Sequence, residues 1–199
     1  SDNATVQDIG LFGADRIGAS IGAQIYVTPS VFAGGEATIT RTIVGARADG
    51  SDSGAGSGWT AMLLNGSANV NNNLMAYLNG SGVRFNGLVS GNSDAITFEN
   101  NEIAYIGGTH IAGDASTIDS SGVTYRGNYV HDVVIMSDVR PYNGKGIELW
   151  YDANNNLVEN NTVEGATTAG IGIGGAATGN TISKNVITGT TGVAGDGGA

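Results

Sequence analysis

The chain has 199 residues, of which 34 are glycine and 40% are hydrophobic, a composition that excludes a disordered protein. Its formal net charge of −10 argues against nucleic acid and anionic membranes as partners, because phosphate groups require Lys and Arg. No apolar run approaches the roughly 18 residues that cross a bilayer, so we expect no membrane insertion.

One short unit recurs along the chain. It has a central residue, an apolar residue three positions before it and another apolar residue two positions after it, as in Val158/Asn161/Val163. In five copies the central residue is Asn, whereas the first two copies have Ile9 and Thr42 there. Successive copies are 33, 31, 28, 27, 33 and 24 residues apart, which favours coils that carry loops of different length. The copies in chain order are Val6/Ile9/Leu11, Ile39/Thr42/Val44, Val70/Asn73/Met75, Phe98/Asn101/Ile103, Tyr125/Asn128/Val130, Val158/Asn161/Val163 and Ile182/Asn185/Ile187.

A second recurring feature is a glycine that precedes a short stretch of alternating apolar residues. Period-2 alternation is typical of a β-strand. The glycine precedes the next copy of the first unit by 12 to 17 residues, so both features keep step along the chain. These glycines are Gly22, Gly58, Gly82, Gly108, Gly146 and Gly170.

Each coil is therefore predicted to contain a strand, a turn, a second strand, an abrupt bend at Asn, a third strand and a loop. Asn tolerates the left-handed backbone conformation that a one-residue bend needs. The sequence predicts an all-β, right-handed, single-stranded parallel β-helix of about 6–7 coils. In successive coils, a hydrogen-bonded ladder is expected for Asn73, Asn101, Asn128, Asn161 and Asn185.

The Gly-Ile-x-Leu and Asn-x-Val/Ile elements resemble the right-handed parallel β-helix proteins of the pectate-lyase-like superfamily over nearly the whole chain. The resemblance identifies architecture better than function, because these proteins include polysaccharide lyases, glycoside hydrolases, epimerases, tailspikes, adhesins and structural filaments. It implies a secreted or cell-surface location. Residues 1–199 are expected to form one solenoid segment, uncapped at both ends, that belongs to a longer solenoid or stacks end to end.

The resemblance also implies a site on the outward face of the first strand of each coil. There Glu148 and Trp150 alternate with inward apolar residues. The predicted register puts Arg84, His110 and Glu148 on neighbouring rungs, about 4.8 Å apart. As catalytic residues, Arg84 would hold a uronate, His110 would transfer a proton and Glu148 would support it. The alternative is a solvated row of ion pairs.

Further substrate-binding candidates surround this row. Tyr26 and Trp150 offer flat faces for sugar rings. The loop 131–145 would form a wall beside the row and contains the candidates Arg140, Tyr142 and Lys145. Asp114 and Asp152 follow the first strands of their coils and suit a hydrolase, a Ca²⁺ site or plain turns.

Metal chemistry is only weakly indicated. A zinc site is rejected, because the chain has two His and no Cys. Asp49 and Asp52 could also bind Ca²⁺, but their loop lacks EF-hand spacing, so Ca²⁺ as a cofactor stays open. Gly172 and Gly174 are predicted to leave a smooth outward strip that something approaches closely.

Two functional hypotheses follow. The first is an extracellular polysaccharide-binding or polysaccharide-processing protein, which as an enzyme would be a lyase, glycoside hydrolase or epimerase. The second is a structural or adhesive surface solenoid without catalysis. They differ in whether the row of Arg84, His110 and Glu148 lies in a cleft or on a flat face.

Overall fold

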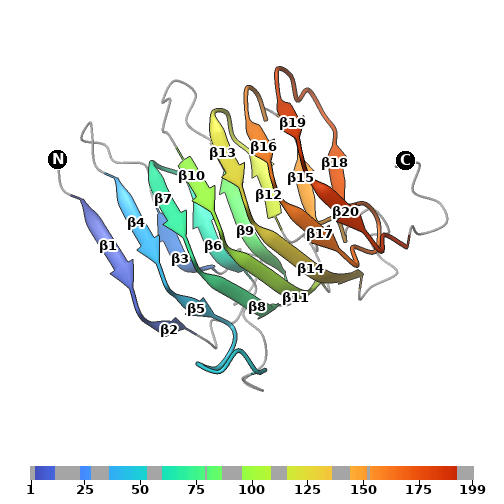
Figure 1. The fold of residues 1–199 in the computed structure, drawn as a ribbon. Helices are drawn as coiled ribbons and strands as arrows, with labels where there is room; N and C mark the ends of the chain where they lie inside the picture. The colour runs from blue at the N-terminus through green and yellow to red at the C-terminus, as the bar shows by residue number, and fades with distance from the viewer. Residues whose placement is uncertain are drawn as a thin grey trace.

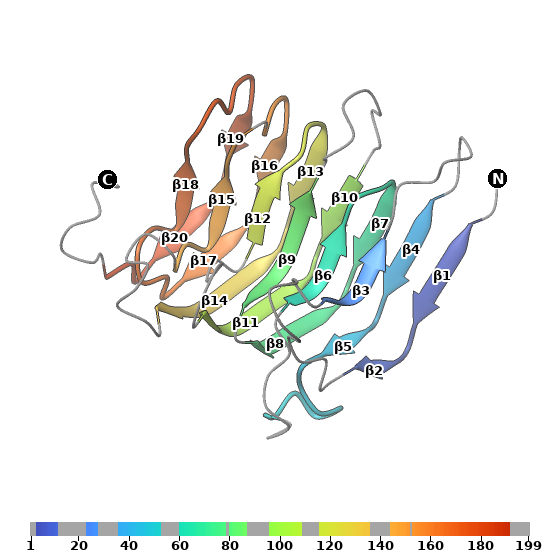
Figure 2. The same ribbon diagram turned by 180° about the vertical axis from the view of Figure 1, so that it is seen from behind.

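The computed structural model of the chain describes residues 3–11, 23–27, 36–52, 60–78, 80–86, 96–108, 116–135, 144–151 and 153–191. Within these ranges every regular element is a β-strand. The strands stack into three parallel sheets, which we call A, B and C (Figures 1 and 2). The predicted all-β solenoid is confirmed.

Each sheet collects one strand from each successive coil. Sheet A consists of β1 (Ala4–Gln7), β4 (Ala37–Thr40), β7 (Ala68–Asn71), β10 (Ile96–Glu99), β13 (Val123–Arg126), β16 (Leu157–Glu159) and β19 (Thr181–Ser183). Sheet B consists of β2 (Gly10–Leu11), β5 (Ile43–Val44), β8 (Leu74–Leu78), β11 (Glu102–Gly108), β14 (Tyr129–Ile135), β17 (Thr162–Glu164) and β20 (Val186–Thr188). Sheet C consists of β3 (Ala23–Val27), β6 (Thr60–Leu64), β9 (Ser81–Asn86), β12 (Ser116–Asp119), β15 (Ile147–Leu149) and β18 (Ile171–Ile173).

The interior is built from columns of apolar side chains, because alternate residues of every strand point inward. In sheet A, Phe98 and Tyr125 occupy paired positions and their rings stack with centroids 5.1 Å apart. Phe85 of sheet C meets Phe98 edge-on at 5.4 Å. Burial raises the pKa of Tyr125, whose hydroxyl lies 2.7 Å from Ser116 Oγ. Sheets A and C therefore contact each other through aromatic side chains in the core.

The asparagine ladder forms at the bend between sheets A and B. The Oδ1 atom of each rung accepts hydrogen bonds from the backbone N and the Nδ2 of the previous rung, at 2.9 to 3.1 Å. Each Nδ2 also donates to a backbone carbonyl, as Asn128 does to Phe98 O at 3.0 Å. The buried amides are thus satisfied, which is the condition for keeping polar groups inside.

We predicted that the ladder asparagine would adopt the left-handed conformation of this bend. That prediction is wrong, because the positive φ belongs to the residue before it. That position is occupied by Asp8 (φ 55°), Arg41 (φ 50°), Asn72 (φ 56°), Asn100 (φ 55°), Gly127 (φ 65°), Asn160 (φ 55°) and Lys184 (φ 56°). The ladder residue must keep its amide inside the solenoid, so the preceding residue makes the bend and points its side chain outward.

A second, shorter asparagine pairing lies where the chain enters sheet A. The backbone N of Asn156 donates to Asn180 Oδ1 at 3.0 Å, and Asn156 Oδ1 accepts from Val123 N at 2.8 Å. Asn156 and Asn180 directly precede β16 and β19. The sequence already showed this signal, because both residues stand one position before matching strands, 24 residues apart.

Candidate functional site

The outer face of sheet C places Arg84 and Glu148 in one column, two rungs apart. Strand pairing puts Thr117 on the rung between them. We predicted His110 at that rung, and the predicted register is therefore wrong in this coil. His110 itself lies outside the described residues.

The error arose from the choice of glycine. Gly108, which we predicted to precede the first strand of its coil, is the last residue of β11 in sheet B. The strand that enters sheet C there is β12, which begins at Ser116 without a preceding glycine. In the N-terminal coils, Leu63 and Tyr26 continue the column of Arg84.

Glu148 forms an ion pair with Lys145. Lys145 Nζ lies 3.0 Å from Glu148 Oε1, and the two side chains are only 13% and 12% exposed. The Lys145 chain lies over Gly172 on the next rung, where an added Cβ would be 2.6 Å from Lys145 Cδ. Lys145, predicted to bind substrate, thus binds the carboxylate that was predicted to support catalysis.

Trp150 covers the other glycine of the predicted strip. A Cβ added to Gly174 would overlap Trp150 Cζ3, so the indole occupies the space that the glycine leaves. The close approach that we predicted for Gly172 and Gly174 therefore comes from side chains of the preceding rung.

The remaining predicted residues are dispersed or outside the described ranges. Tyr26 is 56% exposed and its hydroxyl accepts a hydrogen bond from Asn65 Nδ2 at 3.0 Å. Outside the described residues lie Asp114, Arg140, Tyr142 and Asp152.

No metal site is assembled in the described part of the chain, where no group of three or more His, Asp or Glu side chains could hold an ion. Asp49 instead accepts hydrogen bonds from the backbone N and hydroxyl of Ser51, at 3.0 and 2.7 Å. These bonds lower the pKa of Asp49. Over the same ranges, no helix is long and apolar enough to cross a membrane.

The outer face of sheet B carries a cluster that the sequence analysis missed. Tyr77 and Tyr105 stack on neighbouring rungs with centroids 4.7 Å apart and planes 6° apart. Tyr129 and His131 stack at 4.4 Å, and Tyr105 meets the His131 ring edge-on at 5.6 Å. Tyr105 and Tyr129 stay 47% and 39% exposed. We call Tyr77, Tyr105, Tyr129 and His131 the aromatic cluster.

Carboxylates border the aromatic cluster. The two ring nitrogens of His131 lie 2.8 Å from Asp132 Oδ2 and 3.2 Å from Glu102 Oε1. The Tyr129 hydroxyl donates to Glu164 Oε2 at 2.9 Å, and this hydrogen bond raises the pKa of Tyr129, because it stabilises the neutral phenol. The cluster therefore combines flat apolar faces with fixed hydrogen-bonding groups.

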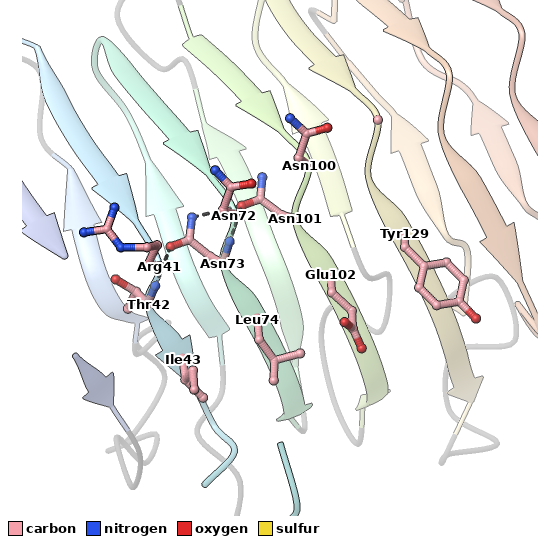
Figure 3. A pocket seen from close by; sticks show the side chains of 11 residues that line it. Arg41, Thr42, Ile43, Asn72, Asn73, Leu74, Asn100, Asn101, Glu102 and Tyr129 are labelled. Atoms are coloured by element: carbon pink, nitrogen blue, oxygen red, sulfur yellow. Dashed lines mark hydrogen bonds between the residues drawn. The ribbon is translucent and has the colours of Figure 1, made fainter. Parts of the chain in front are cut away.

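A groove of about 550 Å³ adjoins the cluster along the bend between sheets A and B. Figure 3 shows its side chains in two rows, one from the bend and one from sheet B. Tyr129 and Glu102 belong to both the groove and the border of the cluster. The lining residues are Arg41, Thr42, Ile43, Asn72, Asn73, Leu74, Asn100, Asn101, Glu102, Gly127 and Tyr129.

The cluster could have been found from the ladder register. Tyr77 and Tyr105 each stand four positions after a ladder asparagine, and His131 and Glu164 each stand three positions after one. We applied the register to the first strand of each coil and not to the third. An aromatic residue repeated at one offset in neighbouring coils was the available signal.

A family model described as the right-handed β-helix region matches residues 60–198 of the chain. Searches of curated proteins and of solved structures found no match. The match covers more than half of the chain. It agrees with the three parallel sheets, in each of which neighbouring strands come from successive coils. The chain belongs to the right-handed β-helix family.

Proposed function

We propose that this β-helix is an extracellular polysaccharide-binding protein whose ligand lies against the aromatic cluster on the outer face of sheet B. The observation that carries the proposal is the stack of Tyr77 and Tyr105 on neighbouring rungs, in which Tyr105 stays 47% exposed. Aromatic rings contribute a large apolar area together with a polar end, which suits the face and the hydroxyl groups of a sugar ring.

The surroundings of the rings support binding in the same place. Tyr129 and His131 are held by hydrogen bonds to Glu164, Asp132 and Glu102, so their rings are oriented before a ligand arrives. A pre-oriented surface loses less entropy when it binds. The adjoining groove adds a concave wall, as expected of a binding site.

We place no catalytic step on the sheet C row. Thr117 occupies the rung between Arg84 and Glu148, and Glu148 is bound to Lys145. The alternative of a solenoid without a ligand makes the opposite prediction about the cluster, because exposed tyrosines would then be dispensable.

The test measures the affinity of the chain for a panel of soluble polysaccharides by affinity electrophoresis and calorimetry. Tyr105→Ala and Tyr129→Ala are each expected to weaken binding about tenfold, which corresponds to about 1.4 kcal/mol. Tyr105→Phe is expected to retain most of the affinity, because it keeps the ring.

Tyr151→Ala is the matched control for Tyr105→Ala. Both tyrosines are exposed and have a left-handed backbone conformation, with φ of 46° at Tyr151 and 52° at Tyr105. Tyr151, however, follows β15 of sheet C and lies away from the aromatic cluster. Its replacement is expected to change affinity less than about twofold, within the range of a neutral surface contact. Equal losses in both variants would contradict the proposed site, and no binding by any polysaccharide would favour the ligand-free solenoid.

A further inference from the structure

The groove runs along the stacking direction of the solenoid and not along a strand. Its bend row advances by one coil at a time through Arg41, Asn72, Asn100 and Gly127, and its sheet B row through Ile43, Leu74, Glu102 and Tyr129. Three rung spacings of about 4.8 Å make the lined length roughly 14 Å. The rung spacing is close to the advance per sugar of an extended chain of pyranose rings, so each coil would face about one sugar.

The bend row offers amide groups to hydroxyls. Asn72 and Asn100 are exposed, and their left-handed backbones turn their side chains away from the core. Asn72 Nδ2 donates to Asn71 Oδ1 at 2.9 Å, and one such bond leaves further donor and acceptor capacity in the amide. Asn100 leans over the next rung, where a Cβ on Gly127 would be 2.6 Å from Asn100 Oδ1.

The sheet B row supplies contact area for a sugar chain. Ile43 and Leu74 are partly buried, and Tyr129 belongs both to this row and to the aromatic cluster. One side of the groove can therefore contact ring faces while the other bonds hydroxyls. This division matches the two kinds of surface on a pyranose.

The charges of the groove disfavour an acidic ligand. Arg41 is the one base among its eleven lining residues, and its guanidinium binds Asp8 through two hydrogen bonds of 2.6 and 2.7 Å. Glu102 contributes a carboxylate to the opposite row. A uronate would meet a base already engaged and an acid of its own charge.

We infer that the groove at the bend between sheets A and B binds a neutral polysaccharide lying parallel to the solenoid axis, with Asn72 and Asn100 bonding its hydroxyls. The inference rests on the proposed function and names its ligand class and direction. It differs from the sequence-based hypothesis, which placed a uronate on the face of sheet C.

The experiment compares three probes of similar length on the whole chain by calorimetry: hydroxyethylcellulose, polygalacturonate and chitosan, which are neutral, anionic and cationic. Asn100→Gly and Asn72→Gly remove the amides and keep a residue that accepts positive φ. Each is expected to weaken hydroxyethylcellulose binding about fivefold, the effect of one hydrogen bond.

The matched control is Asn155→Gly. Asn155 also has a positive φ of 56°, is exposed, and places its Oδ1 against the position of a Cβ built on Gly179, but it lies at a different bend. Its removal is expected to leave affinity unchanged. A circular dichroism melt of each variant confirms that the fold is kept.

The outcomes separate the two proposals. Neutral binding that falls in the groove variants and not in Asn155→Gly supports the inference. Stronger binding of polygalacturonate or chitosan than of the neutral polymer overturns it. So does unchanged affinity in Asn72→Gly and Asn100→Gly while Tyr105→Ala, whose ring lies in the aromatic cluster and does not line the groove, weakens binding about tenfold; in that case the proposed function stands. If none of the three probes binds, the inference fails; the proposed function fails with it only when the wider polysaccharide panel shows no binding either.

Discussion

The outer faces of sheets B and C differ in what fills the space above their strands. On sheet C, Lys145 and Trp150 lie over Gly172 and Gly174 of the next rung and fill the strip that these glycines leave. On sheet B, Tyr105 projects into solvent beside a groove. An outward glycine in a solenoid is therefore not by itself an opening for a ligand, because a side chain of the neighbouring rung can occupy the space.

Both faces rest on the same interior, so we expect a substitution there to destabilise the chain most. Asn128→Ala removes the acceptor of Asn101 N and a donor to Phe98 O inside the ladder. Buried groups left without partners each cost about 1–3 kcal/mol, so we expect the free energy of unfolding to fall by about 3 kcal/mol. Denaturation followed by circular dichroism measures this change.

Asn160→Gly serves as the control for the ladder variant. Asn160 is exposed and precedes the ladder residue Asn161, and glycine keeps its positive φ of 55°. The free energy of unfolding is expected to change by less than about 0.5 kcal/mol. If Asn128→Ala were as mild, the ladder would not be a main support of the fold.

A second variant opens the filled face. Gly174→Ala puts a Cβ into the space held by Trp150 Cζ3, so the indole must move outward. We expect a loss of about 2 kcal/mol in the free energy of unfolding, the usual effect of overpacking, and a red shift of Trp150 emission. Fluorescence is measured in a Trp59→Phe background, which leaves Trp150 as the one emitter.

Gly10→Ala is the matched control, because nothing lies within 4 Å of a Cβ at Gly10. Stability should stay the same there. An unshifted emission maximum in Gly174→Ala would mean that Trp150 does not cover the strip.

The ion pairs of sheet C and of the groove differ in their exposure to solvent. Lys145 and Glu148 are 13% and 12% exposed, whereas Asp8 and Arg41 at the groove are each 55% exposed. Double-mutant cycles should give a coupling of about 1 kcal/mol for the first pair and a smaller coupling for the second, since solvent and salt screen exposed charges. A stronger coupling in the exposed pair would reverse this ranking.

The sequence predicted the fold well, because the fold depends on local repetition. The ladder asparagines and the apolar columns recur at offsets that any coil must keep, so their register could be found without the structure. The sheet C row failed because it depended on the loop lengths between the columns. β11 extends to Gly108, and β12 begins without a glycine.

The sequence did not predict which outward side chains contact one another across neighbouring rungs. The contact of Lys145 with Glu148 depends on a side chain reaching across Gly172, and the contact of Trp150 depends on the gap at Gly174. Such contacts require rotamers as well as register. The aromatic cluster needed only register, and it was within reach of the sequence because Tyr77 and Tyr105 share one offset from the ladder.

The smallest expected effect tests whether the groups around the aromatic cluster are held in place. The hydrogen bond to Glu164 raises the pKa of Tyr129, so in the folded chain this phenol should ionise above the ordinary value of about 10. The folded pKa exceeds the unfolded one, and the contribution to stability is therefore present below the unfolded pKa and lost as pH rises through the folded pKa.

Glu164→Gln removes the charged acceptor and should move the midpoint of Tyr129 back toward the ordinary value. An ultraviolet titration of each chain, minus that of its Tyr129→Phe counterpart, isolates this phenol from the other tyrosines. Identical midpoints in the original chain and in the Glu164→Gln variant would show that the 2.9 Å bond is not kept in solution. Tyr129 would then be oriented by its stacking on His131 alone, and the hydrogen bond that supports its pre-orientation in the proposed site on sheet B would be lost.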